Sequence, residues 1–359
     1  MEFPRFKYMT WAKEVECASG IHLSSSGLPC PAPEALDLLI SPPRIKQDST
    51  YGDIELIEAI AKRYRSDSEN IFLAPGSSAA NYTVMGVLLE KDDEVIVESP
   101  AYEVLAQIPL VFGAKVKRWH RKFENSWKLD FKQLSELLTN KTKLIVLTNP
   151  HNPTGISLDS EELTHLKQIA DAHDLYVMFD EVFIEMIKDK FSISALNRSK
   201  RFVVTGSITK AFGLGGIRLG WAIAQPHLVE KMMYFQDLMS VNNAEPSMDI
   251  ALRLFKKIDE FVKHNAQILI ENSAIIENWL EKYENIQCKF NTEVAFCFPR
   301  LTEINTQKFL DILQKKYNTY VVPGHFFDNY VEHIRLGFGI NKNLLLKGLE
   351  NIDLVLNSI

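Results

Sequence analysis

The sequence lacks the features that mark several common classes of protein. No apolar run approaches the roughly 18 residues of a membrane helix, and residues 1–16 mix charged and apolar side chains, unlike the apolar core of a signal peptide. The formal net charge of -6 leaves no basic excess for nucleic acid or an acidic membrane surface. The 4 cysteines form no C-x-x-C pair, which favours reduced thiols and gives no support to a metal site. We therefore expect a cytoplasmic protein without a nucleic-acid, membrane or metal partner.

The stretch GSITKAFGLGGIRLGW, residues 206–221, is rich in glycine but lacks both common phosphate-binding motifs. A P-loop places its lysine after its second glycine, whereas Lys210 precedes the glycine cluster here. A dinucleotide fingerprint that begins at Gly213 and Gly215 needs a third glycine at the position of Arg218. The lysine and the arginine therefore need another explanation.

The chain has 359 residues, which predicts one large and one smaller domain. Short apolar runs alternate with helical patterns between about residues 50 and 225, and several runs are apolar throughout, which is typical of parallel strands covered on both faces. Strands are predicted at 70–74, 94–99, 114–119, 143–150, 175–181, 201–207 and 220–224. Further strand candidates at 294–299, 319–324 and 333–339 follow long helical stretches, and a helix is predicted at 341–356.

The predicted fold is α/β, with a three-layer α/β/α large domain built on a mainly parallel seven-stranded sheet and a smaller α+β domain. We expect residues 46–250 to form the large domain and residues 251–359 the small one. Residues 1–45 are expected to be an N-terminal segment that joins the small domain.

Polar groups follow three of the predicted strands, where an open parallel sheet builds its site. Ser77 and Ser78 follow Gly76 at the start of a helix, so their free N–H groups suit an anion. The run NPTG, residues 152–155, presents the amide of Asn152 from a rigid loop, although such a run can be only a turn. Asp180 ends an apolar strand, where a buried carboxylate needs a cationic partner.

Together these motifs resemble the class I and II aminotransferases, which are fold-type I pyridoxal-phosphate enzymes. The resemblance rests on NPTG, an aspartate 28 residues after its asparagine, S-x-x-K 27 residues after that aspartate, and an arginine 8 residues after the lysine. It runs from about Ser24 to Arg335 and implies that the cofactor is pyridoxal 5'-phosphate.

The resemblance implies a role for each residue near the cofactor. Lys210 would hold the cofactor as a Schiff base and move a proton during catalysis, while Asp180 would pair with the pyridinium nitrogen. Asn152 would donate a hydrogen bond to the phenolic oxygen, and Tyr102 would stack on the ring. The phosphate would be bound by Ser77, Ser78, Ser207 and Arg218, and the glycines around Arg218 would allow close backbone approach.

Other matches concern the substrate and a second subunit. Arg335 resembles the arginine that binds the substrate α-carboxylate, and Asn152 and Gly27 are further substrate-binding candidates. Tyr51 resembles a tyrosine that reaches the phosphate of a neighbouring subunit, which implies a homodimer with shared active sites. By the same resemblance, residues 24–27 would close over the substrate and residues 240–245 would face the partner.

One position departs from the family pattern. Phe183 stands where the family usually has a tyrosine that donates to the phenolic oxygen. We therefore expect one hydrogen bond fewer and a higher pKa for the Schiff base.

The sequence predicts an aminotransferase that moves an amino group from an L-amino acid to a 2-oxo acid. A β-lyase, cyclase or decarboxylase of the same fold is an alternative, since these share the lysine, the aspartate and the phosphate-binding residues. A non-catalytic sensor that binds the cofactor is a second alternative, although a helix-turn-helix extension and a basic patch are lacking. The amino donor and acceptor cannot be read from the sequence.

Overall fold

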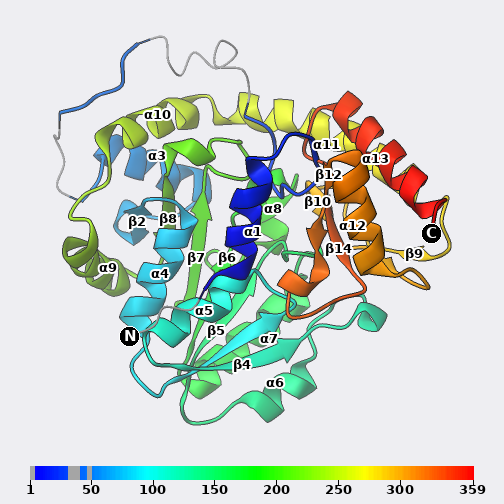
Figure 1. Ribbon diagram of the computed structural model, residues 1–359. Helices are drawn as coiled ribbons and strands as arrows, with labels where there is room; N and C mark the ends of the chain where they lie inside the picture. The colour runs from blue at the N-terminus through cyan, green and yellow to red at the C-terminus, as the bar shows by residue number, and fades with distance from the viewer. Residues whose placement is uncertain (1–4, 31–40, 47–50) are drawn as a thin grey trace.

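A seven-stranded sheet crosses the larger part of the computed structural model, which describes residues 5–30, 41–46 and 51–359 (Figure 1). Its strands are β2 (Ile71–Ala74), β3 (Glu94–Ser99), β4 (Lys115–His120), β5 (Thr142–Thr148), β6 (Tyr176–Asp180), β7 (Phe202–Ser207) and β8 (Gly220–Ile223). The strand order is β2-β8-β7-β6-β5-β3-β4, and neighbours are parallel except at β8, which is antiparallel to β2 and β7. The prediction of a mainly parallel seven-stranded sheet is confirmed.

Helices cover both faces of this sheet because its strands are apolar on both sides. Successive residues of a strand point to opposite faces, so Val95 and Val97 pack under one helical layer and Ile96 under the other. The first layer contains α4 (Ser77–Leu88), α5 (Glu103–Val111) and α9 (Pro226–Met239), and the second contains α6 (Phe131–Leu137) and α7 (Ser160–His173). This is the predicted three-layer α/β/α arrangement.

Local sequence signals set where these helices begin. The side chain of Asp159 accepts from the backbone N–H groups of Glu161 and Glu162 at 3.0 and 2.9 Å, and Glu162 completes a capping box at the start of α7. Gly76 caps α4 with a φ of 89°, a left-handed conformation that glycine adopts without strain. The sharp turn directs the first N–H groups of α4 toward the carboxyl end of the sheet.

The C-terminal part is a smaller mixed region, seen in orange and red beside the sheet (Figure 1). A three-stranded antiparallel sheet runs β10 (Phe296–Cys297), β14 (Ile334–Gly337) and β13 (Val322–Pro323). Short pairs form between β9 (Ile286–Gln287) and β11 (Arg300–Leu301), and between β1 (Ile21–His22) and β12 (Thr319–Tyr320).

Besides α1, the other α-helices of the described chain are α3 (Ile54–Tyr64), α8 (Lys190–Ile193), α10 (Glu245–Lys256), α11 (Ile258–Leu280), α12 (Thr306–Tyr317) and α13 (Lys342–Leu356).

The N-terminal helix α1 (Lys7–Glu16) lies against both parts of the molecule (Figure 1). The carboxylate of Glu103 in α5 accepts from the backbone N–H groups of Lys7 and Tyr8 at 3.2 and 2.8 Å, which satisfies two free donors at the helix start. The Tyr8 ring packs against Tyr102 and Phe327, with ring centroids 5.8 and 5.9 Å away. These contacts fix α1 between the sheet and the C-terminal part.

The predicted division at residues 46 and 251 stays a prediction. Pairing of β1 with β12 does bring the N-terminal segment to the C-terminal part. Residues 1–4 and 31–40 of that segment lie outside the described residues, as do residues 47–50 before Tyr51. In the described part of the chain, no helix is both long enough and apolar enough to cross a membrane.

Candidate active site

A cavity of about 580 Å³ lies where β5 and β6 end, and it gathers most of the predicted site residues. Its position agrees with the rule that open parallel sheets bind ligands at the carboxyl ends of their strands. The predicted residues that line it are Ser77, Ser78, Tyr102, Asn152, Asp180, Lys210, Arg218 and Arg335.

Asp180 is held at the base of this cavity by two hydrogen-bond donors. Its Oδ2 accepts from the Asn81 side-chain amide at 2.9 Å, and its Oδ1 accepts from the Val182 backbone N–H at 3.2 Å. The Thr205 hydroxyl donates to the Asn81 carbonyl oxygen at 2.6 Å, which turns the amide nitrogen of Asn81 toward Asp180. Burial raises the pKa of Asp180, and the two donors and the charge of Lys210 oppose that change only in part. A cation against this carboxylate would stabilise its charged form.

Lys210 lies on the turn that follows β7, in the same cavity. Burial, together with the nearby charge of Arg335, lowers the pKa of its amine from 10.5 to about 8. At pH 7 about one molecule in ten would therefore carry a neutral amine, against roughly one in three thousand for an ordinary lysine. This amine is a better nucleophile at neutral pH than an exposed lysine.

Ser77, Ser78 and Arg218 line the cavity, with Gly76 next to them, and suit a bound anion. Arg218 has a φ of 55°, and its guanidinium donates to the carbonyl oxygens of Gly215 and Pro75, both at 3.1 Å. A Cβ atom at Gly76 would lie 2.5 Å from the Arg218 Nη2. The start of α4 adds free N–H groups and the positive end of a helix dipole.

The predicted role of the glycines around Arg218 is confirmed in part. A Cβ at Gly220 would lie 2.5 Å from the backbone of Gly76 and Ser77, and one at Gly213 would lie 2.4 Å from the backbone of Pro29 and Cys30. Gly216 has open space around it, so close approach does not explain that glycine.

Arg335 lies on β14 and is only 1% exposed. Its Nη1 donates to Asn152 Oδ1 at 2.9 Å, and its Nη2 donates to the Tyr8 hydroxyl at 2.9 Å and the Ser24 carbonyl at 2.8 Å. Its Nε has no hydrogen-bond partner. The guanidinium is thus held in place, is not paired with a carboxylate among the described residues, and faces the cavity.

Three predicted residues do not line the cavity. The Ser207 hydroxyl, at the end of β7, accepts from the Thr209 backbone N–H at 3.2 Å. Gly27 packs against Lys210, where a Cβ would lie 3.3 Å from the lysine Cδ, and the neighbouring Ser26 does line the cavity. The Tyr51 hydroxyl donates to Asp237 at 3.0 Å on the surface, so its predicted contact with a second subunit stays a prediction.

The sequence analysis missed Tyr8, Lys13, Asn81 and Thr205. Asn81 lies one helical turn after Ser77, and Thr205 lies two residues before Ser207 on the same face of β7, so a helical and a strand projection of the motifs could have found both. Tyr8 and Lys13 carry no local signal, because their place depends on how α1 docks.

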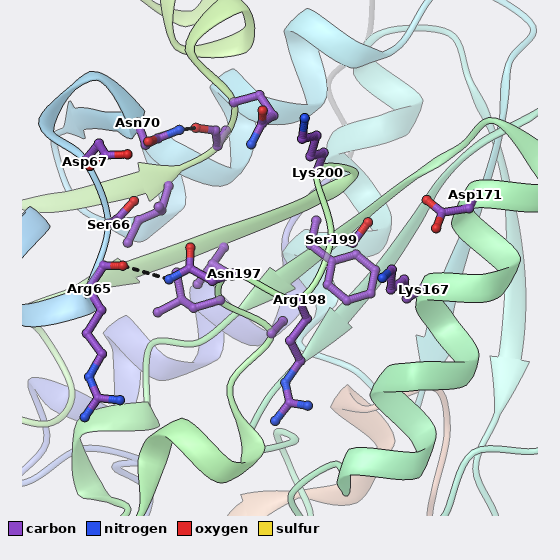
Figure 2. A pocket seen from close by; sticks show the side chains of 17 residues that line it. Arg65, Ser66, Asp67, Asn70, Lys167, Asp171, Asn197, Arg198, Ser199 and Lys200 are labelled. Atoms are coloured by element: carbon purple, nitrogen blue, oxygen red, sulfur yellow. Dashed lines mark hydrogen bonds between the residues drawn. The ribbon is translucent and has the colours of Figure 1, made fainter.

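A second cavity of about 520 Å³ lies apart from this site and does not share its residues. Figure 2 shows its basic side chains, among them Arg65, Lys167 and Lys200, spread around the cavity instead of converging on one point. The Arg198 guanidinium there is bound by the carbonyl oxygens of Ser192 and Ser194. In the described ranges, no group of three or more His, Cys, Asp or Glu side chains is placed to hold a metal ion.

The cavity fits pyridoxal 5'-phosphate in three respects. A buried carboxylate lacks a full cationic partner, a lysine has a lowered pKa, and a helix start with an arginine beside it is open to a phosphate. On a mainly parallel α/β sheet, this combination defines a pyridoxal-phosphate-dependent enzyme of fold type I.

Comparison with known proteins identifies the family. The aminotransferase class I and II profile matches residues 22–352. An aspartate aminotransferase from Sulfolobus acidocaldarius is 27% identical over 331 residues, covering 87% of this chain and 82% of the relative. A histidinol-phosphate aminotransferase from Methanococcus maripaludis is 30% identical over 266 residues, covering 73% and 70%. A PLP-dependent aminotransferase structure from Streptococcus suis superimposes with a TM-score of 0.92 at 25% identity, covering 100% and 99%. The chain belongs to the class I and II aminotransferases, and its cofactor is pyridoxal 5'-phosphate.

Proposed function

We propose that this aminotransferase moves an amino group from an L-amino acid to a 2-oxo acid, with Lys210 as the Schiff-base lysine. The observation that supports the proposal most is that Lys210, Asp180 and Arg335 line one cavity. The reaction needs an amine, a counter-charge for the cofactor ring and a carboxylate receptor in one place.

The residues of the cavity would hold the cofactor at both ends. Asp180 would pair with the ring nitrogen, and Asn81 and Thr205 would keep its carboxylate oriented. Asn152 would donate to the phenolic oxygen through its amide nitrogen, since its amide oxygen already accepts from Arg335. Ser77, Ser78 and Arg218 would bind the phosphate together with Ser207 at the end of β7. Tyr102 would lie on the ring. The bound cofactor supplies an electron sink for the bonds at the substrate α-carbon.

Lys210 and Arg335 would act on the substrate itself. Arg335, held by Asn152, Tyr8 and Ser24, would bind the α-carboxylate and so place the α-carbon near Lys210. The amine of Lys210 would be free to carry a proton from the substrate α-carbon once the substrate amine has displaced it from the cofactor, and a pKa of about 8 suits that role.

We also propose a cytoplasmic homodimer in which Tyr51 and residues 240–245 face the partner. Large apolar side chains near Tyr51 support the proposal: Ile54 is 70% exposed, Leu238 91% and Val241 59%. The 4 cysteines form no C-x-x-C pair in the sequence, which supports a reducing compartment. Sedimentation equilibrium tests the dimer, and a monomer with full cofactor affinity would contradict it.

A panel of amino acids tests the reaction type. We expect an L-amino acid to convert the aldehyde form of the bound cofactor to the amine form, a 2-oxo acid to restore the aldehyde form, and steady-state kinetics to be ping-pong. Release of ammonia, carbon dioxide or sulfide without a need for oxo acid would instead indicate the lyase or decarboxylase alternative, and a cyclised product the cyclase. Bound cofactor with no turnover of any amine would indicate the sensor.

We predict that capture of the cofactor by the cofactor-free protein follows the titration of Lys210. Only the neutral amine reacts, so the rate should rise with pH and reach half its maximum near pH 8 instead of near 10.5. The charge of Arg335 also lowers the pKa of Lys210, so Arg335→Met should move this midpoint upward. Stopped-flow absorbance of the covalent adduct measures the rate, and a midpoint near 10.5 in the unaltered protein would contradict the prediction.

A second prediction concerns Phe183, which lines the cavity and packs on Phe296 with ring centroids 4.9 Å apart. In Phe183→Tyr, a new hydroxyl should donate to the phenolic oxygen, draw charge from it and lower the pKa of the Schiff base. A pH titration of the bound cofactor's absorbance measures this pKa. An unchanged value would mean that another hydroxyl already donates, and Thr148 is the candidate, because Thr148 lines the cavity and its buried Oγ1 has no hydrogen-bond partner.

A further inference from the structure

The active-site cavity is lined by a fourth cation, Lys13, in addition to Lys210, Arg218 and Arg335. Lys13 lies on α1, and the same helix contributes Phe6, Tyr8 and Met9 to the wall. No hydrogen bond or ion pair joins its amine to another described residue, and its side chain is exposed. Met9 and Lys13 are four residues apart, so they lie on one face of α1, and that face looks onto the cavity.

The docking of α1 places Lys13 on the same helix as Tyr8, which contacts the carboxylate receptor Arg335. The Tyr8 hydroxyl accepts from Arg335, and Lys13 follows five residues later, about 7.5 Å further along the helix axis. Glu16, one turn on, is close enough for its charge to raise the pKa of Lys210. Lys13 therefore lies on the α1 wall of the cavity, on the stretch of helix between Tyr8, which contacts Arg335, and Glu16, whose charge reaches Lys210.

The charges of the cavity leave Lys13 without a matching anion. Under the proposed function, Lys210 holds the cofactor, Arg218 its phosphate and Arg335 the substrate α-carboxylate. Asp180 is the one carboxylate among the cavity-lining residues, and it is assigned to the ring nitrogen. A substrate with a neutral side chain would thus leave the charge of Lys13 without an anionic partner, whereas a second anionic group on the substrate would pair with it.

We infer that Lys13 is a specificity-determining residue that binds a second anionic group, a carboxylate or a phosphate, on the substrate side chain. This inference rests on the proposed function, because it takes Arg335 as the receptor of the first carboxylate. Met9 and Tyr8 would pack against the methylene groups between the two charges. The neutral wall formed by Phe6, Tyr102 and Phe183 still accepts apolar substrates, but without this added attraction.

The test compares substrates that differ only in charge. The ratio of kcat/KM for glutamate to that for glutamine, and for aspartate to asparagine, should fall about 2- to 5-fold in Lys13→Gln, as expected for loss of an exposed ion pair. O-phosphoserine against serine distinguishes a phosphate from a carboxylate. Lys7→Gln is the matched control, because Lys7 is exposed on the same helix but does not line the cavity, and it should leave each ratio unchanged.

Charge reversal provides a second measurement that loss of folding cannot imitate. Lys13→Glu should lower the acidic-to-neutral ratio further and raise the kcat/KM for lysine or arginine relative to glutamine. Equal ratios in the unaltered protein, Lys13→Gln and Lys13→Glu would overturn the inference. An absence of transamination with every amino acid in the unaltered protein would instead overturn the proposed function, so the two failures are separate.

Discussion

Replacement of Lys210 by alanine should abolish the covalent cofactor adduct and nearly all turnover. A Schiff base needs an uncharged amine in reach of the cofactor aldehyde, and Lys210 is the lysine of the active-site cavity whose pKa burial lowers to about 8. The proton that moves at the substrate α-carbon loses its carrier in the same variant, so two functions disappear together. Borohydride reduction followed by peptide mass analysis locates the adduct, and an amino-acid panel measures turnover.

Lys200→Ala is the matched control for this result. Lys200 lines the second cavity in Figure 2 and is exposed, so its variant should keep the adduct on Lys210 and the turnover. Cofactor should still bind Lys210→Ala without a covalent bond, because Asp180 and the proposed phosphate-binding residues Ser77, Ser78 and Arg218 remain. If borohydride fixes the cofactor to another lysine in Lys210→Ala, the assignment of the reactive lysine is wrong.

The sheet and most of the cavity could be predicted because they depend on short stretches of sequence. Apolar runs of four to eight residues predict covered strands, and the polar residues at their ends are brought to one edge by the parallel order. Asn152 and Asp180 follow β5 and end β6, which are neighbours in the sheet. Their predicted proximity therefore needed no knowledge of long-range packing.

The direction of β8 and the role of Tyr8 could not be predicted in this way. A short apolar run such as Gly220–Ile223 does not show the direction of its strand. β8 is antiparallel to β7 because residues 208–219, which carry Lys210 and Arg218, return the chain beside β7 without a crossover α-helix. Tyr8 reaches Arg335 across 327 residues of chain through the docking of α1. The reactive groups of the site therefore lie in short sequence motifs, whereas groups that orient them come from distant parts of the chain.

Hydrogen bonds from distant groups also favour the charged form of Asp180. Its strand supplies one donor nearby, from Val182, but the second comes from Asn81 on α4, which Thr205 on β7 holds in turn. Both bonds are donated to the carboxylate, so each favours its ionised form against the cost of burial. The cofactor nitrogen would meet an acceptor whose direction is set by three separate elements of the fold.

We expect Arg335→Lys to weaken all amino-acid and oxo-acid substrates together. The guanidinium can bind a carboxylate through a planar fork, whereas lysine offers a single point charge on a flexible stem. Lysine would also lose part of the support from Asn152, Tyr8 and Ser24, which fix the present geometry. The loss should be on the order of 2–4 kcal/mol, a roughly 30- to 1000-fold fall in kcat/KM for every substrate. Steady-state kinetics over acidic, neutral and aromatic substrates measures it.

Two further measurements separate substrate binding by Arg335 from a general effect on the fold. Cofactor affinity should hardly change in Arg335→Lys, because this arginine makes no hydrogen bond to Asp180, Ser77 or Arg218. Arg300→Lys changes the same residue type in the same part of the molecule, where Arg300 pairs with Glu332 at 2.8 Å near the surface, and should leave kcat/KM unaltered. A loss confined to substrates of one side-chain type would show that Arg335 recognises a side chain, and the α-carboxylate would then need another receptor. A uniform loss, with glutamate and glutamine falling by the same factor, would leave the discrimination between them to Lys13.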